Sequence, residues 1–217
     1  MYLRFHQTIF WLAGVISTSL IAGCNNSDSK LPIIGERDTI ERVTEDGQTV
    51  VDTIYHVIPD FSFIDQDSNT VTQKTVEGKI YISDFFFTSC PTICPVMKKQ
   101  MLKIYKAIAD DPEVMILSHT IDPRHDTPAV LKKYAEELGV TGNKWLFLTG
   151  EKEKIYEIGQ RGYLVSAKED ENEPGGFIHN GAFMLIDKNR NIRGMYDGTT
   201  DEGAEKLLKD LKKLKTE

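Results

Sequence analysis

Several features that define other protein classes are scarce in this chain of 217 residues. It has three cysteines, too few for a disulfide-stapled scaffold or a four-thiolate zinc site. Lysine and arginine total 26 against 33 aspartate and glutamate, so the formal net charge is −7. Nucleic acid is therefore not an expected partner, because broad binding to it requires clustered positive charge. With 40% hydrophobic and 27% charged residues, the composition fits one soluble globular domain plus an extra segment.

A long apolar run lies at the N-terminus. Residues 7–23 carry no charge, and the run ends in small residues that lead directly into Cys24. This pattern resembles a bacterial lipoprotein signal, in which Cys24 is lipidated and becomes the first mature residue. The alternative is an uncleaved membrane anchor with an incidental cysteine. Both interpretations predict an extracytoplasmic domain tethered to a membrane, with Cys90 and Cys94 as a pair in an oxidising compartment.

Hydrophobic patterning predicts alternating strands and helices along the rest of the chain. Strands are expected at 49–58, as a hairpin around the polar turn 65–69, at 80–87, 114–121 and 145–148, and as a hairpin joining 183–186 to 192–196. Helices are expected at 97–108, 127–139, 151–160 and 204–214. This order predicts an α/β fold with helices on both faces of the sheet.

A cysteine pair between the first central strand and its helix indicates a thioredoxin-like sheet flanked by helices, preceded by an N-terminal β extension. We divide the chain into a signal peptide over residues 1–23, a tether and N-terminal extension over 24–50, and a thioredoxin-like domain over 51–217. The segment directly after Cys24 is polar and is expected to be a flexible tether.

The candidate reactive centre is the run 85–95, which contains Cys90 and Cys94. Cysteines four apart at the start of a helix share one face, with Cβ atoms about 5–6 Å apart. Two such thiolates can hold one metal ion, or can close into a disulfide with some adjustment of the backbone. A helix N-terminus should lower both thiol pKa values and favour the thiolate. In this arrangement Pro91 takes the first helical position.

Two sulfurs leave a metal site incomplete, and two thiolates with one imidazole suit copper in either oxidation state. Among the histidines, we expect structural roles for His119, inside a predicted strand, and for His125, just before a helix. His179 follows an acidic run over residues 167–176, which we expect to be a mobile, solvated loop. A histidine at the end of such a loop can move onto the cysteine pair when metal binds.

Three blocks of the sequence resemble the Sco/SenC family, which helps to assemble cytochrome c oxidase. Residues 87–95 are similar to the family's copper-site motif. Residues 121–128 resemble its second block, an Asp-Pro followed by an Asp-Thr-Pro helix start. Residues 179–187 match its third block, in which the copper-binding histidine precedes a strand. The resemblance runs from about Tyr55 to Leu214, and it implies that Cys90, Cys94 and His179 bind copper as Cu(I) or Cu(II).

Asp122 matches a family aspartate near the copper site, where it tunes the ligands or partner recognition. It is equally well read as a turn residue that helps to start the following helix. The neighbours of His179 depart from the family pattern, because Ile178 and Asn180 stand where Asp and Ser or Thr are common. The surroundings of that ligand, and with them metal affinity and redox potential, are left open by the sequence.

Two functions of different classes fit these residues. The first, which we favour over an enzyme, is a membrane-tethered copper metallochaperone, which receives one copper ion from a donor and delivers it toward the copper-site subunit of cytochrome c oxidase. The second is a thiol–disulfide oxidoreductase that keeps partner cysteines reduced through Cys90 and Cys94, without a histidine. A peroxidase that uses Thr88 leaves the second cysteine unexplained. A purely structural disulfide closing so short a loop adds little stability.

Overall fold

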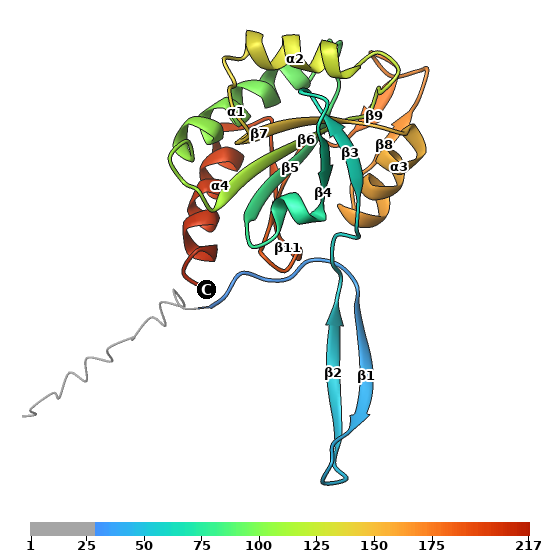
Figure 1. Cartoon of the computed structure of the whole chain (residues 1–217), viewed down its shortest axis with the longest axis vertical. Helices are drawn as coiled ribbons and strands as arrows, with labels where there is room; N and C mark the ends of the chain where they lie inside the picture. The colour runs from blue at the N-terminus through green and yellow to red at the C-terminus, as the bar shows by residue number, and fades with distance from the viewer. Residues whose placement is uncertain (1–28) are drawn as a thin grey trace, which may run out of the picture.

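A seven-stranded mixed sheet forms the centre of the molecule (Figure 1). The computed structural model describes residues 29–217, so the expected signal peptide and Cys24 lie outside the described residues. The strand order is β11-β10-β5-β6-β7-β3-β4, with β5, β6 and β7 parallel and the other neighbours antiparallel. The strands are β3 (Ser62–Asp65), β4 (Thr70–Thr72), β5 (Ile80–Phe86), β6 (Val114–Thr120), β7 (Trp145–Thr149), β10 (Ala182–Ile186) and β11 (Ile192–Asp197).

The parallel strands β5, β6 and β7 are buried at every position. This burial explains their nearly continuous apolar sequences, because a parallel sheet is covered by helices and has no solvent face. The helices are α1 (Cys94–Ala107), α2 (Pro128–Glu137), α3 (Lys152–Glu157) and α4 (Asp201–Leu214); a π-helix (Ile158–Gly162) continues α3, and a short 3-10 helix (Gln73–Val76) precedes β5. The Thr127 side chain caps α2 by accepting a hydrogen bond from the Val130 backbone N–H, with Pro128 in the first turn.

Helices cover both faces of the sheet, as predicted. Helices α1 and α2 pack on the face that carries Asp84 and Phe86, and α4 packs beside α1. On the opposite face the π-helix lies close to β5, where a Cβ added at Gly159 would meet the Phe85 ring at 3.1 Å. The Tyr163 ring packs on the same phenylalanine, with centroids 5.5 Å apart. The α/β prediction and the two expected hairpins, β3–β4 and β10–β11, are confirmed.

One predicted segment has a different structure. The acidic run expected to be a mobile loop contributes to a two-stranded antiparallel sheet of β8 (Ala167–Glu169) and β9 (Phe177–His179). Its middle is exposed, as its charge suggests, but its first three residues pair with the three residues that follow the run. The turn closes through backbone hydrogen bonds from Asp170 N to Gly176 O and from Gly176 N to Glu173 O. Backbone pairing therefore orders a segment that its composition marks only as polar.

An antiparallel hairpin of β1 (Arg37–Val43) and β2 (Thr49–Tyr55) is separate from the main sheet, and the boundary expected between residues 50 and 51 falls inside β2. The hairpin projects from the body of the molecule, and all its strand residues are exposed (Figure 1). Within residues 29–217, no helix is both long and apolar enough to span a bilayer.

Candidate metal centre

The cysteine loop connects the end of β5 to the start of α1. Cys90 and Cys94 are both buried, with 8% and 4% of their surface exposed. The Cys90 backbone N–H donates to the Phe87 carbonyl at 3.2 Å, and its Sγ lies 3.6 Å from the Thr92 hydroxyl oxygen. Cys90 therefore sits in a turn that presents its sulfur toward the helix start.

The expectation that both cysteines lie on one helical face is wrong, because α1 begins only at Cys94. The reason is Pro95, which occupies the first turn of the observed helix. If Pro91 were the first helical residue, Pro95 would be the fifth, where its missing N–H breaks a hydrogen bond and its ring clashes with the preceding turn. The second proline thus delays the helix and leaves Cys90 outside it.

The two thiols differ in acidity. Burial raises the pKa of Cys90, but hydrogen bonds from the Cys94 thiol and from the backbone N–H groups of Thr92 and Cys94 outweigh it, so the net shift is downward. Burial is also the largest effect on Cys94, and its bond to Cys90 adds to it, so its pKa lies well above the usual thiol value. The predicted lowering therefore holds for Cys90 and is wrong for Cys94, because only one member of the pair accepts the other's proton.

A buried carboxylate anchors the segment that precedes the cysteines. Asp126, fully buried, accepts hydrogen bonds from the Thr88 backbone N–H at 3.0 Å, from the Thr88 hydroxyl at 2.5 Å and from the Thr120 hydroxyl at 2.5 Å. It joins the cysteine loop to the end of β6. Asp126 was not among the predicted site residues, although it lies inside the second motif block.

Asp122 lies in the turn between β6 and α2. Its side-chain oxygen accepts from the His125 backbone N–H at 3.4 Å, and its carbonyl accepts from the Asp126 N–H at 2.9 Å. These contacts favour the turn role that the sequence left open. A role for Asp122 beside a bound metal stays a prediction.

A second buried carboxylate, Asp84, lines the same small cavity as Cys94. The Ser118 hydroxyl donates to it at 2.5 Å. Burial raises the pKa of Asp84 to about 7, and the bond from Ser118 offsets only part of that effect. Nothing in the sequence marked this residue, because an aspartate in a strand is ordinarily read as an interruption of the apolar run.

The β8–β9 hairpin packs on the cysteine loop. The Phe177 ring of β9 lies 4.9 Å from the Phe87 ring, centroid to centroid. A Cβ placed on Gly175 would lie 2.9 Å from side-chain atoms of both Phe87 and Pro91, and this glycine has a φ of +88°. The turn therefore needs glycine both for its backbone conformation and for its close approach.

His179 is the last residue of β9 and pairs with Ala167 on β8. Its side chain lies outside the described residues. Residues on either side of it lie close to the cysteine loop and the start of α1. Phe177 contacts the cysteine loop, and a Cβ on Gly181 would lie 3.3 Å from Ile93 Cδ1. The backbone at His179 thus runs past the start of α1.

His119 and His125 do not converge with the two cysteines as a described metal site. His119 is fully buried among aromatic rings, and His125 is exposed in the turn before α2. Among the described side chains, which do not include that of His179, no three histidine, cysteine or acidic residues converge as a metal site. The described donors are the two thiols, one of them with a lowered pKa, and these are soft ligands that suit copper better than hard cations.

Comparison with known proteins identifies the relatives of this chain. Residues 51–216 match the family model described as SCO1/SenC. The chain belongs to the SCO1/SenC family. The match begins inside β2, so β1 of the projecting hairpin lies outside the matched range. The resemblance expected from the three sequence blocks is confirmed.

Solved structures of Sco proteins share the fold of this chain. A SCO1/SenC family lipoprotein from Bacillus anthracis aligns with a TM-score of 0.68 at 30% identity, covering 74% of this chain and 95% of that one. BsSco, a member of the Sco family of cytochrome c oxidase assembly proteins with a disulfide switch, aligns with a TM-score of 0.66 at 30% identity. The alignment covers 74% of this chain and 94% of BsSco. Copper-bound ScoI from Bradyrhizobium japonicum aligns with a TM-score of 0.61 at 25% identity, covering 73% of this chain and 99% of that one. The predicted thioredoxin-like fold is confirmed by these likenesses.

Proposed function

We propose that this protein is a copper metallochaperone that binds one copper ion through Cys90, Cys94 and His179 and delivers it toward the copper centre of cytochrome c oxidase. The observation that carries the proposal is the packing of the β8–β9 hairpin on the cysteine loop, which brings the backbone at His179 past the start of α1. A copper-bound ScoI and the oxidase-assembly protein BsSco among its structural relatives support it.

The two thiols enter the proposed site in different protonation states. The Cys90 thiol, with its lowered pKa, is the first sulfur to bind the cargo ion as thiolate. The Cys94 thiol must then release the proton that it shares with Cys90, because thiolates and not thiols are metal ligands. The imidazole of His179 completes a set of two sulfurs and one nitrogen, which accommodates both Cu(I) and Cu(II).

Release begins, in this proposal, at the histidine. Cys94 lies in α1 and Cys90 is a buried residue of the turn before it, whereas His179 ends a short two-stranded sheet outside the main sheet. Two-stranded hairpins are marginally stable by themselves, so β8–β9 is the part of the site that opens at least cost. A sulfur ligand of the recipient subunit then replaces the imidazole.

The location of the protein is part of the proposal. We infer that residues 1–23 are a signal peptide, that Cys24 carries a lipid, and that the domain over 51–217 works outside the cytoplasm on a tether. The Bacillus anthracis relative is a lipoprotein, which supports this assignment. Mass spectrometry of the membrane-extracted protein tests it, since lipidation adds acyl mass to the Cys24 peptide and Cys24→Ser abolishes that mass.

A copper titration of the reduced protein starting at Asn25 tests the metal site. Competition against a Cu(I) chelator is expected to give one tightly bound ion per chain, weakened at least about tenfold by His179→Ala and further by Cys94→Ala. His125→Ala is the matched control, because that histidine is exposed in the α2 turn. Binding that is unaffected by His179→Ala contradicts the three-ligand site.

The second candidate function is a thiol–disulfide oxidoreductase, favoured by the unequal thiols. The Cys90 thiolate would attack a partner's disulfide and expel one partner thiolate, forming a mixed disulfide. Cys94, after losing its proton, would attack Cys90 Sγ and release the second partner thiolate, so that the pair is oxidised as the partner is reduced. Asp84 lines the same cavity as Cys94 and is a candidate acceptor for that proton.

Reduction of a disulfide-linked peptide separates the two functions. Catalysed reduction that survives His179→Ala and is lost in Cys90→Ala supports the oxidoreductase. Slow reduction together with His179-dependent copper binding supports the metallochaperone.

A further inference from the structure

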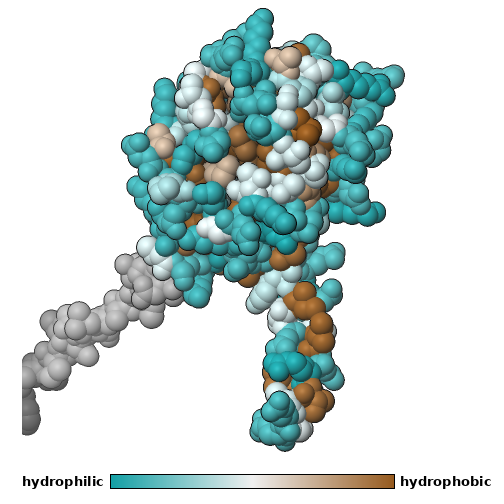
Figure 2. Space-filling model, in the orientation of Figure 1, coloured by the Kyte–Doolittle hydropathy of each residue, from teal (hydrophilic) through white to brown (hydrophobic). Residues whose placement is uncertain are grey.

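The projecting β1–β2 hairpin exposes apolar side chains that no other part of the described chain covers. On one face lie Ile40, Val50 and Ile54, with 52%, 36% and 45% of their surface exposed. Figure 2 shows hydrophobic residues along the length of this arm. An isolated two-stranded hairpin is at best marginally stable in water. A long exposed strand edge with apolar neighbours is a surface suited to further strand pairing.

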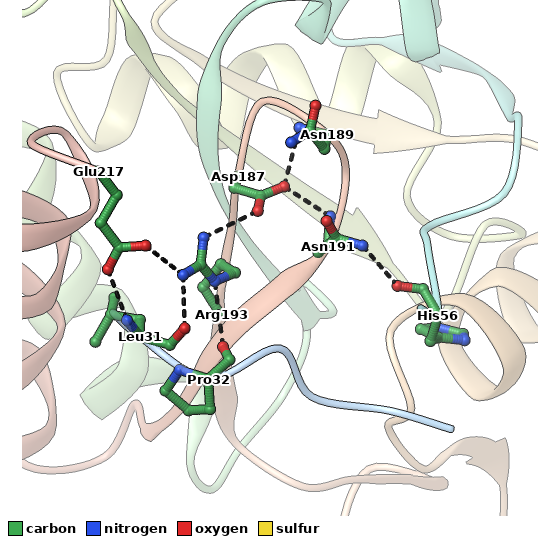
Figure 3. A network of polar contacts seen from close by, with 8 residues as sticks. All are labelled: Leu31, Pro32, His56, Asp187, Asn189, Asn191, Arg193 and Glu217. Atoms are coloured by element: carbon green, nitrogen blue, oxygen red, sulfur yellow. Dashed lines mark hydrogen bonds and ion pairs between the residues drawn. The ribbon is translucent and has the colours of Figure 1, made fainter. Parts of the chain in front are cut away.

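Both ends of the arm are fixed to the body (Figure 3). Arg193 on β11 donates to the carbonyl oxygens of Leu31 at 2.6 Å and Pro32 at 3.2 Å, on the segment leading into β1. Asn191 donates through Nδ2 to the His56 carbonyl at 3.0 Å, just after β2. The hairpin therefore extends from an anchored base, and its exposed edges are held away from the domain.

The hydrogen-bond alternation of the hairpin shows which backbone groups of β1 face outward. His56 N donates to Glu36 O, and Thr44 N donates to Gln48 O, so these two opposite pairs are hydrogen-bonded. In an antiparallel ladder such pairs alternate with pairs whose N–H and C=O groups point away from the partner strand. On β1 the outward groups therefore belong to Arg37, Thr39, Glu41 and Val43.

We propose that β1 pairs antiparallel with β1 of a second copy of this chain, about a two-fold axis through Ile40, to form a four-stranded sheet. This register places Thr39 opposite Glu41 of the second copy and Arg37 opposite Val43, so outward groups meet outward groups. Asp38 then stands opposite Arg42 at both ends, around a central Ile40–Ile40 pair. Within each hairpin Arg42 also pairs with Asp52 at 2.9 Å, so it would bridge two carboxylates in the dimer. Opposite charges and apolar residues directly across two strands stabilise the pairing.

The other edge of the arm does not suit a second copy. Pairing β2 with itself over its full length places the two-fold axis at Asp52 and sets two carboxylates directly opposite each other, which is destabilising. A membrane surface is also disfavoured, because the tip of the arm carries Glu45 and Asp46. Charge thus favours a second copy at the β1 edge.

The proposed pairing leaves the metal centre accessible. Arg37 and Tyr55, at the base of the arm, line a cavity with Ile80, the first residue of β5. The cysteine loop follows the opposite end of the same strand. Two paired copies therefore present their cysteine loops away from the shared arms.

Sedimentation of the protein starting at Asn25, which retains every element described above, tests the pairing. The interface is small, so we expect a weak dimer, with the average mass rising up to about twofold between about 10 and 500 μM. Asp38→Arg alone and Arg42→Asp alone should each stay monomeric, because each sets like charges opposite one another. An equimolar mixture of the two variants restores both opposite-charge pairs and should form a one-to-one dimer.

A pair of proline variants checks the edge that is used. Thr39→Pro removes an outward N–H of β1 without removing a hydrogen bond of the hairpin, and it should abolish the dimer. Thr53→Pro does the same on β2, since Thr53 is opposite Thr39, and it should dimerise like the wild type. Circular dichroism confirms folding of each variant.

Three results overturn the proposal. One is a wild-type protein that stays monomeric over the whole concentration range, whether or not it sediments with anionic vesicles. Another is a dimer lost in Thr53→Pro and kept in Thr39→Pro. The last is a mixture of Asp38→Arg and Arg42→Asp that fails to associate.

Discussion

Asp126 shows how one buried carboxylate fixes a reactive loop that it does not belong to. Its oxygens accept three hydrogen bonds, two from Thr88 in the cysteine loop and one from Thr120 at the end of β6. Because the residue is fully buried, each of these donors loses its partner if the carboxylate is removed.

Removing the Asp126 side chain should therefore destabilise the fold. We expect Asp126→Ala to lower the free energy of unfolding by about 3 kcal/mol, measured by urea denaturation of the copper-free protein. Asp122→Ala is the matched control, because its side chain makes one long hydrogen bond in a half-buried turn, and it should cost less than about 1 kcal/mol. Equal losses in the two variants would contradict the anchoring role of Asp126.

His119 is a second buried group with a measurable consequence. It packs between Phe85 and Phe63, with ring centroids 5.0 and 5.4 Å away, and neither of its ring nitrogens has a hydrogen-bond partner among the described residues. Burial lowers its pKa to about 3. His119 therefore binds a proton near pH 6.5 in the unfolded chain but not in the folded chain. The contribution of the neutral side chain to the free energy of unfolding is complete above pH 6.5 and is lost as the pH drops toward 3.

Replacing this histidine should flatten that pH dependence. Between pH 6.5 and pH 4 we expect the free energy of unfolding of the wild type to fall by about 3 kcal/mol because of His119. In His119→Phe this fall should be absent. Urea denaturation of both proteins at several pH values measures the difference. Parallel stability curves for the two proteins would mean that the pKa of His119 is the same in the folded and the unfolded chain, and would contradict this account.

At the scale of elements, the contact between the β8–β9 hairpin and the cysteine loop is the structural basis of the proposed metal centre. His179 was among the predicted ligands, but the segment before it was expected to be a loop. The acidic composition of this segment indicates that it is exposed. It does not indicate that Ala167 pairs with His179, because that pairing depends on the path of the folded chain. The predicted start of α1 was also wrong. Pro95 excludes a helix that begins at Pro91, because a proline at the fifth helical position is incompatible with the helical hydrogen bonds.

Adjacent glycines in this hairpin provide a matched test. Gly175 and Gly176 both have positive φ, +88° and +83°, but only a Cβ on Gly175 would collide with the cysteine loop. We expect Gly175→Ala to weaken copper binding about tenfold beyond the effect of Gly176→Ala, since both carry a similar backbone strain. Chelator competition measures the two affinities. Equal affinities would mean that the hairpin is not a part of the site.

At the scale of the whole molecule, a buried charge cluster joins the two ends of the described chain. Arg193 pairs with Asp187 at 3.1 Å and also with Glu217, and it binds the carbonyls of Leu31 and Pro32 (Figure 3). The side chains of Arg193 and Asp187 are each only 9% exposed. The loss of one member leaves the others as uncompensated buried charges.

Arg193→Ala should therefore be strongly destabilising. We expect a loss of about 3–5 kcal/mol in the free energy of unfolding, with the N-terminal segment released from the body. Arg190→Ala is the control, because its partner Asp60 is mostly exposed, and it should cost about 1 kcal/mol or less. Hydrogen exchange at Leu31 and Ile34 reports the release. Protection that is unchanged in Arg193→Ala would contradict the anchoring.

The sequence predicted the sheet, its hairpins and the family because buried parallel strands, turns and the cysteine motif each leave a local signature. It did not predict Asp126, Asp84 or Arg193 as key polar residues. Their importance depends on burial beside partners that are distant in the sequence, such as Thr88 for Asp126 and Glu217 for Arg193. Local patterns contain no record of these pairings.

The central claim is that one copper ion is held by two sulfurs and one imidazole nitrogen, and X-ray absorption of the copper-loaded protein tests it most directly. We predict a spectrum fitted by two sulfur ligands and one nitrogen ligand, with the imidazole scattering lost in His179→Ala and kept in His125→Ala. A spectrum of sulfur ligands alone, unchanged by His179→Ala, would contradict the account.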